Sequence, residues 1–347
     1  MSKIVLTTIV GGSIELGEIP FDLYAKGGLG GMVLFCRSGF AITPRHMEAL
    51  KRNDRIFYIS SAEIDAYLDY TFERIEDVIA SETIQPGEKA RIVRGVGKRI
   101  VRKLLDDPRS GEAVKRSGRF IDSQIELIIG SPNAAVHLFA LSAADPYALS
   151  HSINVSTFCI LLGQQLFGQS KEDLHQLGLG GLLHDLGKTQ LDASLLLKRT
   201  PLTEREVTEI KRHPALSAEL IGGHKMPSSV IAIARSHHEM ADGTGYPDGL
   251  RGDAIHPFAR IASVANDYDF MTSDREQHAK MPHLQALSIM AQKIKRYDTK
   301  VFHALLRIVL RDERLIEGFL AKRLKTRDIS AATRHISTNT AAPRAGF

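Results

Sequence analysis

Residues 236–275 read SHHEMADGTGYPDGLRGDAIHPFARIASVANDYDFMTSDR, and the rest of the chain is organised around this stretch. It begins with the adjacent histidines His237 and His238 and ends in an apolar segment that carries Asn266. Between them, residues 241–252 contain four glycines and a proline, which exclude a helix interior. A structured loop between helical segments that bear imidazole and carboxamide or carboxylate groups indicates a metal or ligand site.

The composition is that of a soluble globular protein, with 347 residues, 43% of them hydrophobic and 24% charged. The formal net charge of +5 suits an anionic small molecule and is too small to indicate a nucleic-acid polymer as partner. No apolar run reaches the ~18 residues of a transmembrane span, and the N-terminus lacks the pattern of a secretory signal. Because Cys36 and Cys159 form no disulfide framework, we expect a cytoplasmic protein.

The apolar pattern predicts a mainly α-helical protein with three folded parts and a tail. Residues 1–60 are expected to form a small α/β module, residues 61–130 a helical connector, residues 131–325 an all-α domain, and residues 326–347 a disordered tail. The first module holds no constellation of residues that suggests chemistry. We therefore expect it to act as an accessory module that senses, dimerises or packs.

Local signals place several elements within these parts. The β-branched and apolar runs predict strands at residues 4–10, 32–37 and 55–60, and Pro44 is expected to begin a helix that reaches Leu50. The pairs Ser60–Glu63 and Thr203–Glu206 have the spacing of capping boxes and predict two helix starts.

Histidines and carboxylates recur in segments that are otherwise apolar enough to be core. The positions are His151, His184–Asp185, His213, His237–His238 and Asn266–Asp267. A single buried histidine is usually a hydrogen-bonded core residue, but two adjacent polar groups at the end of the apolar run 177–188 (LGLGGLLHDLGK) are costly to bury without a partner. A divalent metal ion would satisfy both, and helices that each carry ligands could converge on one interior point.

Asp185 is the candidate for a carboxylate that bridges two metal ions, as in the two-metal hydrolysis of phosphate esters. Lys188 follows His184 by one helical turn and would face the same way, which adds a positive charge for a phosphate oxygen. Asp185 and Lys188 are therefore the predicted catalytic residues. The other histidines fit this pattern less well, and surface or core-filling roles are expected for them.

Four motifs follow one another in a recognisable order. They are HDLGK at residues 184–188, HP at residues 213–214, HHE at residues 237–239 and DGTGYPDGLRG at residues 242–252. In these motifs the chain closely resembles the HD-GYP family, a branch of the HD phosphohydrolase superfamily, over roughly residues 133–325. The resemblance implies an all-α domain with two or three metal ions, often iron. It also implies hydrolysis of cyclic di-GMP to pGpG or GMP, or, in some members, of 3′,3′-cyclic GMP-AMP.

The resemblance assigns roles to individual residues. The implied metal ligands are His151, His184, Asp185, His213, His237 and His238. Gly245, Tyr246 and Pro247 form the loop that is expected to shape the mouth of the substrate site, and in some members this loop contacts diguanylate cyclases. Lys188, Tyr246 and Arg275 are the residues expected to contact the substrate.

Three positions depart from the family pattern. Three-metal members carry glutamate where this chain has Tyr147, so two divalent ions are expected, with iron as the first candidate and manganese as the second. Asn266 replaces the final aspartate ligand, and its neutral carboxamide oxygen would bind a cation more weakly. Asp267 is the alternative ligand, provided that a local bulge turns it toward the site. His278 stands where the family has a lysine that contacts the substrate.

The predicted function is metal-dependent hydrolysis of cyclic di-GMP in bacterial second-messenger signalling. One alternative is a 3′,3′-cyclic GMP-AMP phosphodiesterase. Another, motivated by Asn266, is a protein that binds a cyclic dinucleotide or a diguanylate cyclase with little or no cleavage. An HD enzyme for mononucleotides or guanosine polyphosphates is a third, against which the GYP loop argues. We also consider a homodimer, with residues 1–130 controlling its geometry or the access to the active site.

Overall fold

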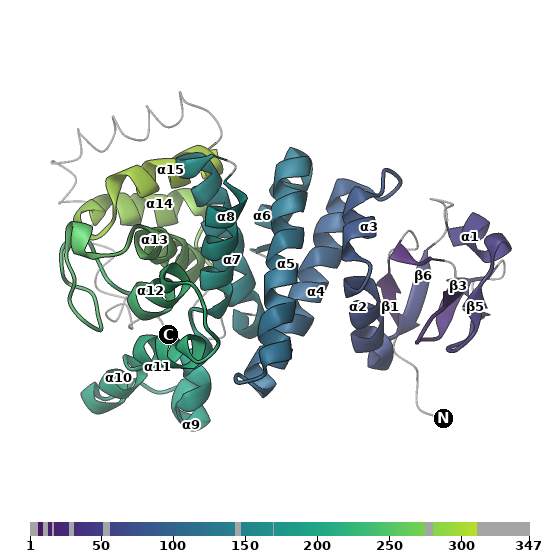
Figure 1. The fold of residues 1–347 in the computed structure, drawn as a ribbon, viewed down its shortest axis with the longest axis horizontal. Coiled ribbons are helices and arrows are strands. Elements are labelled where there is room, and N and C mark those ends of the chain that lie inside the picture. The colour runs from purple at the N-terminus through teal and green to yellow at the C-terminus, as the bar shows by residue number, and fades with distance from the viewer. Residues whose placement is uncertain are drawn as a thin grey trace. The chain divides into compact units, whose positions relative to one another are not determined.

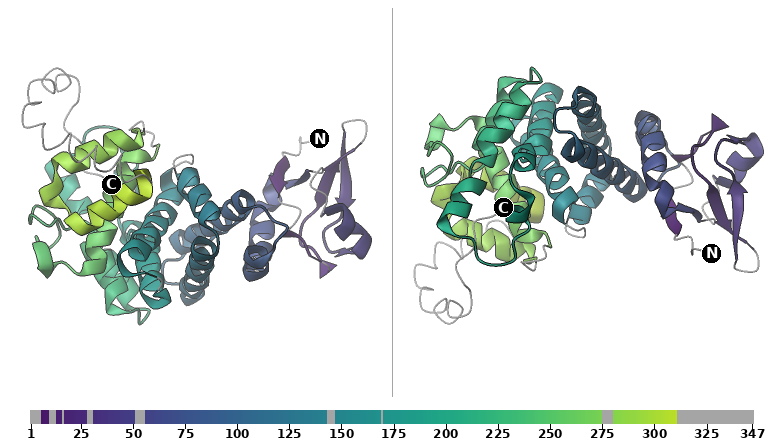
Figure 2. Two further views of the ribbon diagram at one scale, coloured as in Figure 1. Left: turned by 90° about the horizontal axis from the view of Figure 1, so that it is seen from above. Right: turned by 90° about the horizontal axis from the view of Figure 1, so that it is seen from below.

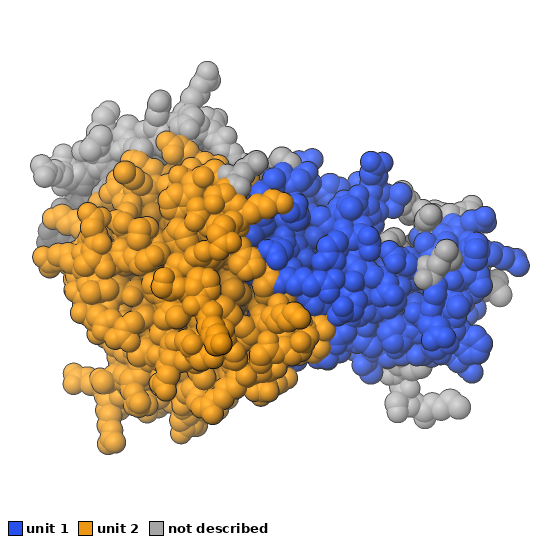
Figure 3. Space-filling view, in the orientation of Figure 1, with its two compact units in different colours: residues 1–102, 119–138 blue, residues 103–118, 139–347 orange. Residues whose placement is uncertain are grey.

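The computed structural model describes residues 6–9, 13–15, 17–27, 31–50, 56–142, 147–168, 170–274 and 280–310. The chain divides into two compact units, one of residues 1–102 and 119–138 and the other of residues 103–118 and 139–347 (Figure 3). Among the described residues, strands occur only in the first unit, and the remaining elements are helical (Figure 1, Figure 2). The mainly α-helical fold class with a small N-terminal α/β region is therefore confirmed.

The strands of the first unit form a four-stranded antiparallel sheet and a two-stranded antiparallel pair. In spatial order, the sheet contains β1 (Leu6–Ile9), β6 (Phe57–Ser60), β3 (Leu23–Lys26) and β4 (Met32–Cys36), and the pair is β2 (Gly17–Glu18) with β5 (Ala41–Ile42). The predicted strands correspond to β1, β4 and β6. The sequence does not predict β2 and β5, which have only two residues each, or β3 (LYAK), which contains no β-branched residue.

Seven helical elements of the described chain precede the larger unit's main helices. They are α1 (Pro44–Leu50), η2 (Ser61–Glu63), α2 (Ile64–Phe72), α3 (Ile75–Ala80), α4 (Pro86–Asp106), α5 (Gly111–Gly130) and α6 (Pro132–Ser142). The ring of Phe21 packs edge-on against Tyr67 and Tyr70 of α2, with centroids 5.6 Å apart in both pairs. Arg99 on α4 pairs with Asp65 of α2 at 2.7 Å, so α2 contacts both the strand-rich core and α4.

The two predicted capping boxes have different outcomes. Thr203 forms the full reciprocal pair at the start of its helix, as its spacing predicts. Ser60 accepts a hydrogen bond from the N–H of Ala62, but the second half of its box is missing. The carboxylate of Glu63 instead accepts from the N–H of Asp22 at 3.0 Å, a competing donor that local spacing does not reveal.

The second unit is a bundle of helices around one apolar core. Its elements are α7 (Tyr147–Phe167), α8 (Lys171–Leu183), η3 (Leu186–Gln190), α9 (Ala193–Leu196), α10 (Glu204–Ile210), α11 (His213–Gly222), α12 (Ser228–Ser236), η4 (Gly252–Ala254), α13 (Pro257–Thr272), α14 (His283–Gln292), η5 (Ile294–Arg296) and α15 (Thr299–Leu310). Phe158, Tyr268 and Phe302 are buried in this core, and each aromatic side chain contributes about 1.5–3 kcal/mol of hydrophobic stabilisation. No helix in the described part of the chain is long and apolar enough to cross a membrane.

A close approach of α7 and α8 brings together segments that are far apart in the sequence. Gly181 faces the backbone of Ser156, and a Cβ atom at Gly181 would lie 2.9 Å from the Cα of Ser156. Only glycine permits this contact without a shift of the backbone. Since His184 follows at the end of α8, the contact places it beside the histidine carried by α7.

Candidate metal centre

Three of the predicted ligand histidines lie where helices end or begin. His184 follows the last residue of α8, His213 begins α11, and His237 follows the last residue of α12. The last carbonyls of a helix lack a partner within it, and the Nδ1–H of each ring satisfies one of them. The pairs are His184 with Gly181 at 2.8 Å, His213 with Ile210 at 2.8 Å and His237 with Ala234 at 2.9 Å.

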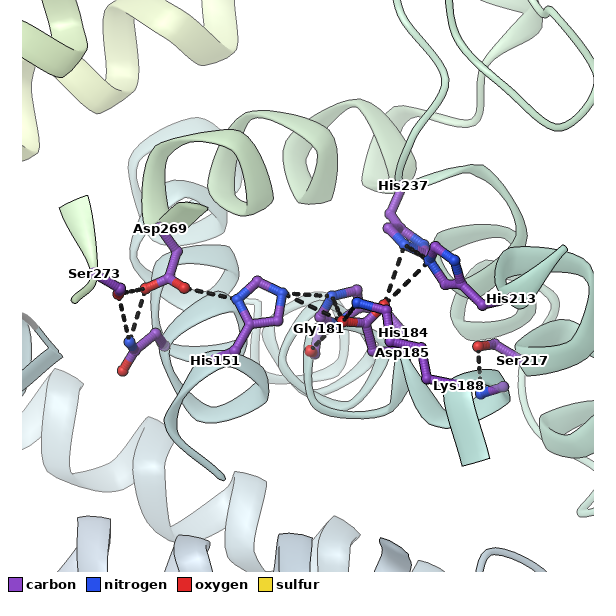
Figure 4. Close-up of polar contacts among 12 residues, drawn as sticks. His151, Gly181, His184, Asp185, Lys188, His213, Ser217, His237, Asp269 and Ser273 are labelled. Carbon is purple, nitrogen blue, oxygen red and sulfur yellow. Dashed lines mark hydrogen bonds and ion pairs between the residues drawn. The ribbon is translucent and has the colours of Figure 1, made fainter. Parts of the chain in front are cut away.

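His151 is oriented differently, by a side chain. Its Nδ1 donates to Oδ2 of Asp269 on α13 at 2.7 Å. The other oxygen of Asp269 accepts from Nδ2 of Asn154 and from Oγ of Ser273, each at 2.7 Å. All four residues are buried, and Figure 4 shows Ser273, Asp269 and His151 as one continuous row of contacts.

These Nδ1 contacts fix which nitrogen carries the proton in the neutral form of each of the four rings. Because a carbonyl or carboxylate can only accept, Nδ1 carries the proton, and Nε2 of a neutral ring is left with a lone pair. The Nε2 atoms of His151 and His184 lie 3.2 Å apart, as do those of His213 and His237. Two lone pairs at this distance repel each other, so each pair is suited to hold a cation.

Asp185 lies between the two pairs (Figure 4). Its Oδ2 is 3.4 Å from Nε2 of His151 and 3.3 Å from Nε2 of His184. Its Oδ1 is 3.2 Å from Nε2 of His213 and 3.7 Å from Nε2 of His237. Oδ1 is buried and, within the described residues, has no hydrogen-bond partner. A carboxylate whose two oxygens face separate groups has the arrangement of a bridging ligand.

The ligand atoms form two groups that share Asp185. One group is Asp185, His213, His237 and His238, the other is His151, His184 and Asp185, and within each group the ligand atoms lie within 4.8 Å of one another. Facing lone pairs and an unpartnered buried carboxylate oxygen are both satisfied by a divalent cation. The residues present therefore fit a two-metal centre.

The titration of the cluster favours the forms that bind metal. Burial opposes the charge on Asp185, but nearby positive charge, including that of Lys188, outweighs it and holds the pKa of the carboxyl well below its ordinary value. Burial also lowers the pKa of His237 and His238 far below that of a free histidine, so these rings are neutral. An ionised carboxylate with neutral imidazoles is the donor set that a divalent ion requires.

Lys188 adds a positive charge beside the cluster. Its Nζ lies 2.7 Å from Oδ2 of Asp185, and the side chain is half-buried. The η3 segment that carries it is attached to α11 by a hydrogen bond of 2.7 Å from the N–H of Gly187 to Oγ of Ser217. Lys188 therefore has a fixed place beside the shared carboxylate.

The loop with Gly245, Tyr246 and Pro247 covers the His238 side of the cluster. The ring of Tyr246 stacks on His238 with centroids 4.7 Å apart and planes inclined by 19°. A Cβ atom at Gly245 would lie 2.5 Å from the carbonyl oxygen of His238, so only glycine fits. Nζ of Lys211 lies 5.2 Å from the centre of the Tyr246 ring, which places a second cation on this side.

Glu239 is a residue of this region that the sequence reasoning missed. The buried carboxylate accepts from the backbone N–H groups of Asp248 at 2.7 Å and Leu250 at 2.9 Å. Arg235 on α12 also pairs with Asp248 at 2.8 Å. The third residue of the HHE motif thus holds the GYP loop against the end of α12. The motif itself was the available signal.

The remaining predicted residues have different positions. Asn266 is buried on α13, one turn before Asp269. Asp267 belongs to neither ligand group, and its Oδ2 accepts from the hydroxyl of Tyr297 at 2.9 Å. Arg275, like His278 and the predicted tail, lies outside the described residues.

Asp269 also escaped the sequence reasoning, which considered only Asn266 and Asp267 in this segment. The available signal was spacing, because residues three apart on a helix share a face. Asn266 and Asp269 are three apart, and Asp269 contacts His151. A search of that face for further carboxylates would have found it.

Comparisons with known proteins agree with this geometry. Residues 139–301 match the HD domain family. The cyclic di-GMP phosphodiesterase PA4108 of Pseudomonas aeruginosa is 33% identical over 216 residues, which are 61% of this chain and 52% of that protein. The cyclic di-GMP phosphodiesterase response regulator RpfG of Xanthomonas campestris is 39% identical over 150 residues, which are 42% of this chain and 39% of that protein.

A relative named for a different substrate is also similar to this chain. The 3′3′-cGAMP-specific phosphodiesterase 3 of Vibrio cholerae is 33% identical over 166 residues, which are 48% of this chain and 36% of that protein. The chain thus spans about half or less of the length of these three relatives.

A solved structure shows the same fold. Bd1817, an HDG"Y"P protein from Bdellovibrio bacteriovorus, superposes with a TM-score of 0.61 over 88% of this chain and 99% of that chain. The two sequences are 23% identical, so the likeness concerns the fold.

Proposed function

We propose that this chain, whose residues 139–301 match the HD domain family, is an HD-GYP protein that hydrolyses a cyclic dinucleotide at the cluster around Asp185. Cyclic di-GMP is the first candidate substrate, with pGpG or GMP as the product. The relatives with 33–39% identity include enzymes named for cyclic di-GMP and for 3′3′-cGAMP, so both substrates belong to the proposal.

One observation carries the proposal more than any other. The two oxygens of Asp185 face separate histidine pairs, and the Nε2 atoms within each pair are 3.2 Å apart. Hydrolysis of a phosphodiester requires charge neutralisation on both the attacking and the leaving side of phosphorus. A carboxylate that can hold two cations side by side is suited to that requirement.

The metal ligands in this proposal come from both sides of Asp185. His151 and His184 would hold one ion with Oδ2, and His213, His237 and His238 would hold the other with Oδ1. Divalent ions at these places would polarise the phosphodiester and make water a stronger nucleophile near neutral pH. Imidazole and carboxylate together suit iron, the first candidate, and manganese, the second.

The side chains of the domain position the phosphodiester and balance its charge. In the reaction, a water oxygen bonds to phosphorus while the bond from phosphorus to the 3′-oxygen breaks, and that oxygen takes up a proton. Lys188 offers N–H donors and a positive charge to a phosphate oxygen at this stage. Tyr246 forms a wall of the mouth over His238, and Arg275 is proposed as a second phosphate contact.

A second candidate function follows from Asn266. This buried amide stands where the family has an aspartate, so it brings no negative charge to a bound cation. A chain with a weakened metal centre could bind a cyclic dinucleotide, or a diguanylate cyclase through the GYP loop, and leave the nucleotide intact. Contact of the GYP loop with a diguanylate cyclase and formation of a homodimer are likewise proposals. A cytoplasmic location is also proposed, and the buried free thiols of Cys36 and Cys159 are in keeping with it.

The decisive experiment is product analysis under anaerobic conditions. The full chain is loaded with iron or manganese and incubated with cyclic di-GMP and, separately, with 3′,3′-cyclic GMP-AMP. We expect a linear dinucleotide or mononucleotide from at least one of them, and none from Asp185→Asn. Tight binding of both nucleotides without any linear product would overturn the enzymatic proposal in favour of the receptor.

A further inference from the structure

We propose that Asp269 is a positioning residue that fixes His151 as a metal ligand, so that the ion on the His151 side of Asp185 depends on this carboxylate. The inference rests on the proposed function only in taking the cluster to be a metal centre. It requires neither a particular nucleotide nor turnover.

The contacts of Asp269 leave it little freedom. The residue has 0% exposure, and its Oδ2 accepts from Nδ1 of His151 at 2.7 Å. Its Oδ1 is held at 2.7 Å by both Nδ2 of Asn154 and Oγ of Ser273. With the carboxylate fixed on both oxygens, the imidazole is fixed too, and Nε2 of His151 faces Asp185 at 3.4 Å.

No other Nδ1 contact of the four rings described above ends on a carboxylate. His184, His213 and His237 donate to backbone carbonyls, which stay in place as long as their helices do. A carboxylate behind a ligand imidazole orients the ring and also raises its basicity as a ligand. His151 therefore gains both its orientation and part of its metal affinity from one side chain.

The neutral side chain of Asn266 makes the negative charge of Asp269 more important on this helix. It precedes Asp269 by one turn, so the two residues share a face of α13. Since the amide is neutral, it adds no negative charge to this face of the helix. Of these two residues, Asp269 alone brings a negative charge, and its hydrogen bond to His151 links that charge to the group of His151, His184 and Asp185.

The test is a metal titration of the full-length, metal-free chain with Co²⁺, followed by calorimetry and visible absorption under anaerobic conditions. We expect two ions to bind the wild type. In Asp269→Asn, one ion should bind with unchanged affinity, and the other should bind about 10- to 100-fold more weakly. A loss of affinity for one ion and not for the other is a result that general loosening of the core would not produce.

Asp267→Asn is the matched control. Asp267 is a carboxylate on the same helix, two residues earlier, and it accepts from Tyr297 and belongs to neither ligand group. The control should bind both ions with wild-type affinity. Thermal unfolding of the metal-free proteins should show that both variants fold.

Ser273→Ala keeps the proposal testable even when Asp269→Asn does not fold. It removes one hydrogen bond to Asp269 while leaving the charge, and we expect it to weaken the same ion about 2- to 10-fold. The proposal is overturned by wild-type affinity for both ions in Asp269→Asn, or by equal weakening of both. Wild-type protein that binds two ions but cleaves neither nucleotide would remove the proposed function and leave this inference intact.

Discussion

The two sides of Asp185 differ in the groups that orient their histidine rings. On the Oδ1 side, His213 and His237 are oriented by backbone carbonyls at the ends of α10 and α12. On the Oδ2 side, His184 is also oriented by a carbonyl, but His151 is oriented by the side chain of Asp269, and Lys188 contacts Oδ2 of Asp185.

This difference shows where the centre can vary. A carbonyl at a helix end cannot be replaced by mutation, so the Oδ1 side is preserved as long as the helices form. The Oδ2 side depends on a side chain at His151, because Asp269 orients that ring, and Asn266 lies on the same helix as Asp269. We therefore expect substitutions on the Oδ2 side to tune the centre and the loss of Asp185 to abolish it.

The largest effect should come from Asp185→Asn, which breaks both sides at once. The neutral amide cannot balance two cations, so both ions should bind more weakly, and hydrolysis should fall on the order of 10⁴-fold. Initial rates of linear dinucleotide formation, together with ion counts per chain, check this. Asp267→Asn serves as the control, and a variant at Asp185 that keeps both ions and its rate would contradict the bridging role.

Lys188→Ala should distinguish an effect on the rate of hydrolysis from an effect on metal binding. Its ammonium group lies 2.7 Å from Asp185 and is proposed to meet a phosphate oxygen. Removing it should lower kcat about 10²- to 10³-fold. The ion count should stay at the wild-type value, as measured on the same samples. Loss of an ion would show that Lys188 acts on the metal centre rather than on the substrate.

The stability of the metal-free protein should depend on pH through the Oδ1 side. Burial lowers the pKa of His213, His237 and His238, so below about pH 6.5 the unfolded chain binds more protons than the folded chain. The free energy of unfolding should therefore fall as pH drops below about 6.5, by up to about 1.4 kcal/mol per pH unit for each histidine.

Chemical denaturation between neutral and mildly acidic pH measures this slope. His238→Gln removes one of the three titrating groups and should make the slope shallower. An identical slope in the variant would show that the buried rings do not control the acid sensitivity of the domain.

The smallest effect is expected at the mouth of the site. Tyr246→Leu removes the ring that stacks on His238, and the loss of an aromatic pair should raise KM about 2- to 10-fold with little change in metal binding. Tyr246→Phe keeps the ring and should behave as the wild type. A large effect of the phenylalanine variant would instead assign a role to the hydroxyl.

The sequence was most informative about the ligand residues whose motifs lie at the end or the start of a helix. The motifs contain His184, Asp185, His213, His237 and His238, and the structure brings these residues and His151 into two groups. The mainly helical fold followed from the apolar periodicity. These features are local, because a ligand beside a helix terminus is fixed by a few neighbouring residues.

The rest depended on contacts between distant segments. Asp269 meets His151 across 118 residues of sequence, and Glu239 holds the loop through backbone N–H groups that have no sequence signature. The pairing of β3 with β6 and the hydrogen bond between Asp22 and Glu63 also join segments that are far apart in the sequence. Register and partner choice between separate segments are set by packing, which a single sequence does not display.

The most direct test of the two-sided centre is hydrolysis measured against ion occupancy. Metal-free protein is titrated anaerobically with Mn²⁺ or Fe²⁺ while bound ions per chain and linear product from cyclic di-GMP and 3′,3′-cyclic GMP-AMP are recorded together. We predict that product formation begins only as the second ion binds and reaches its maximum at two ions per chain. Full activity with a single ion, or no product from either nucleotide at two ions, would contradict the account.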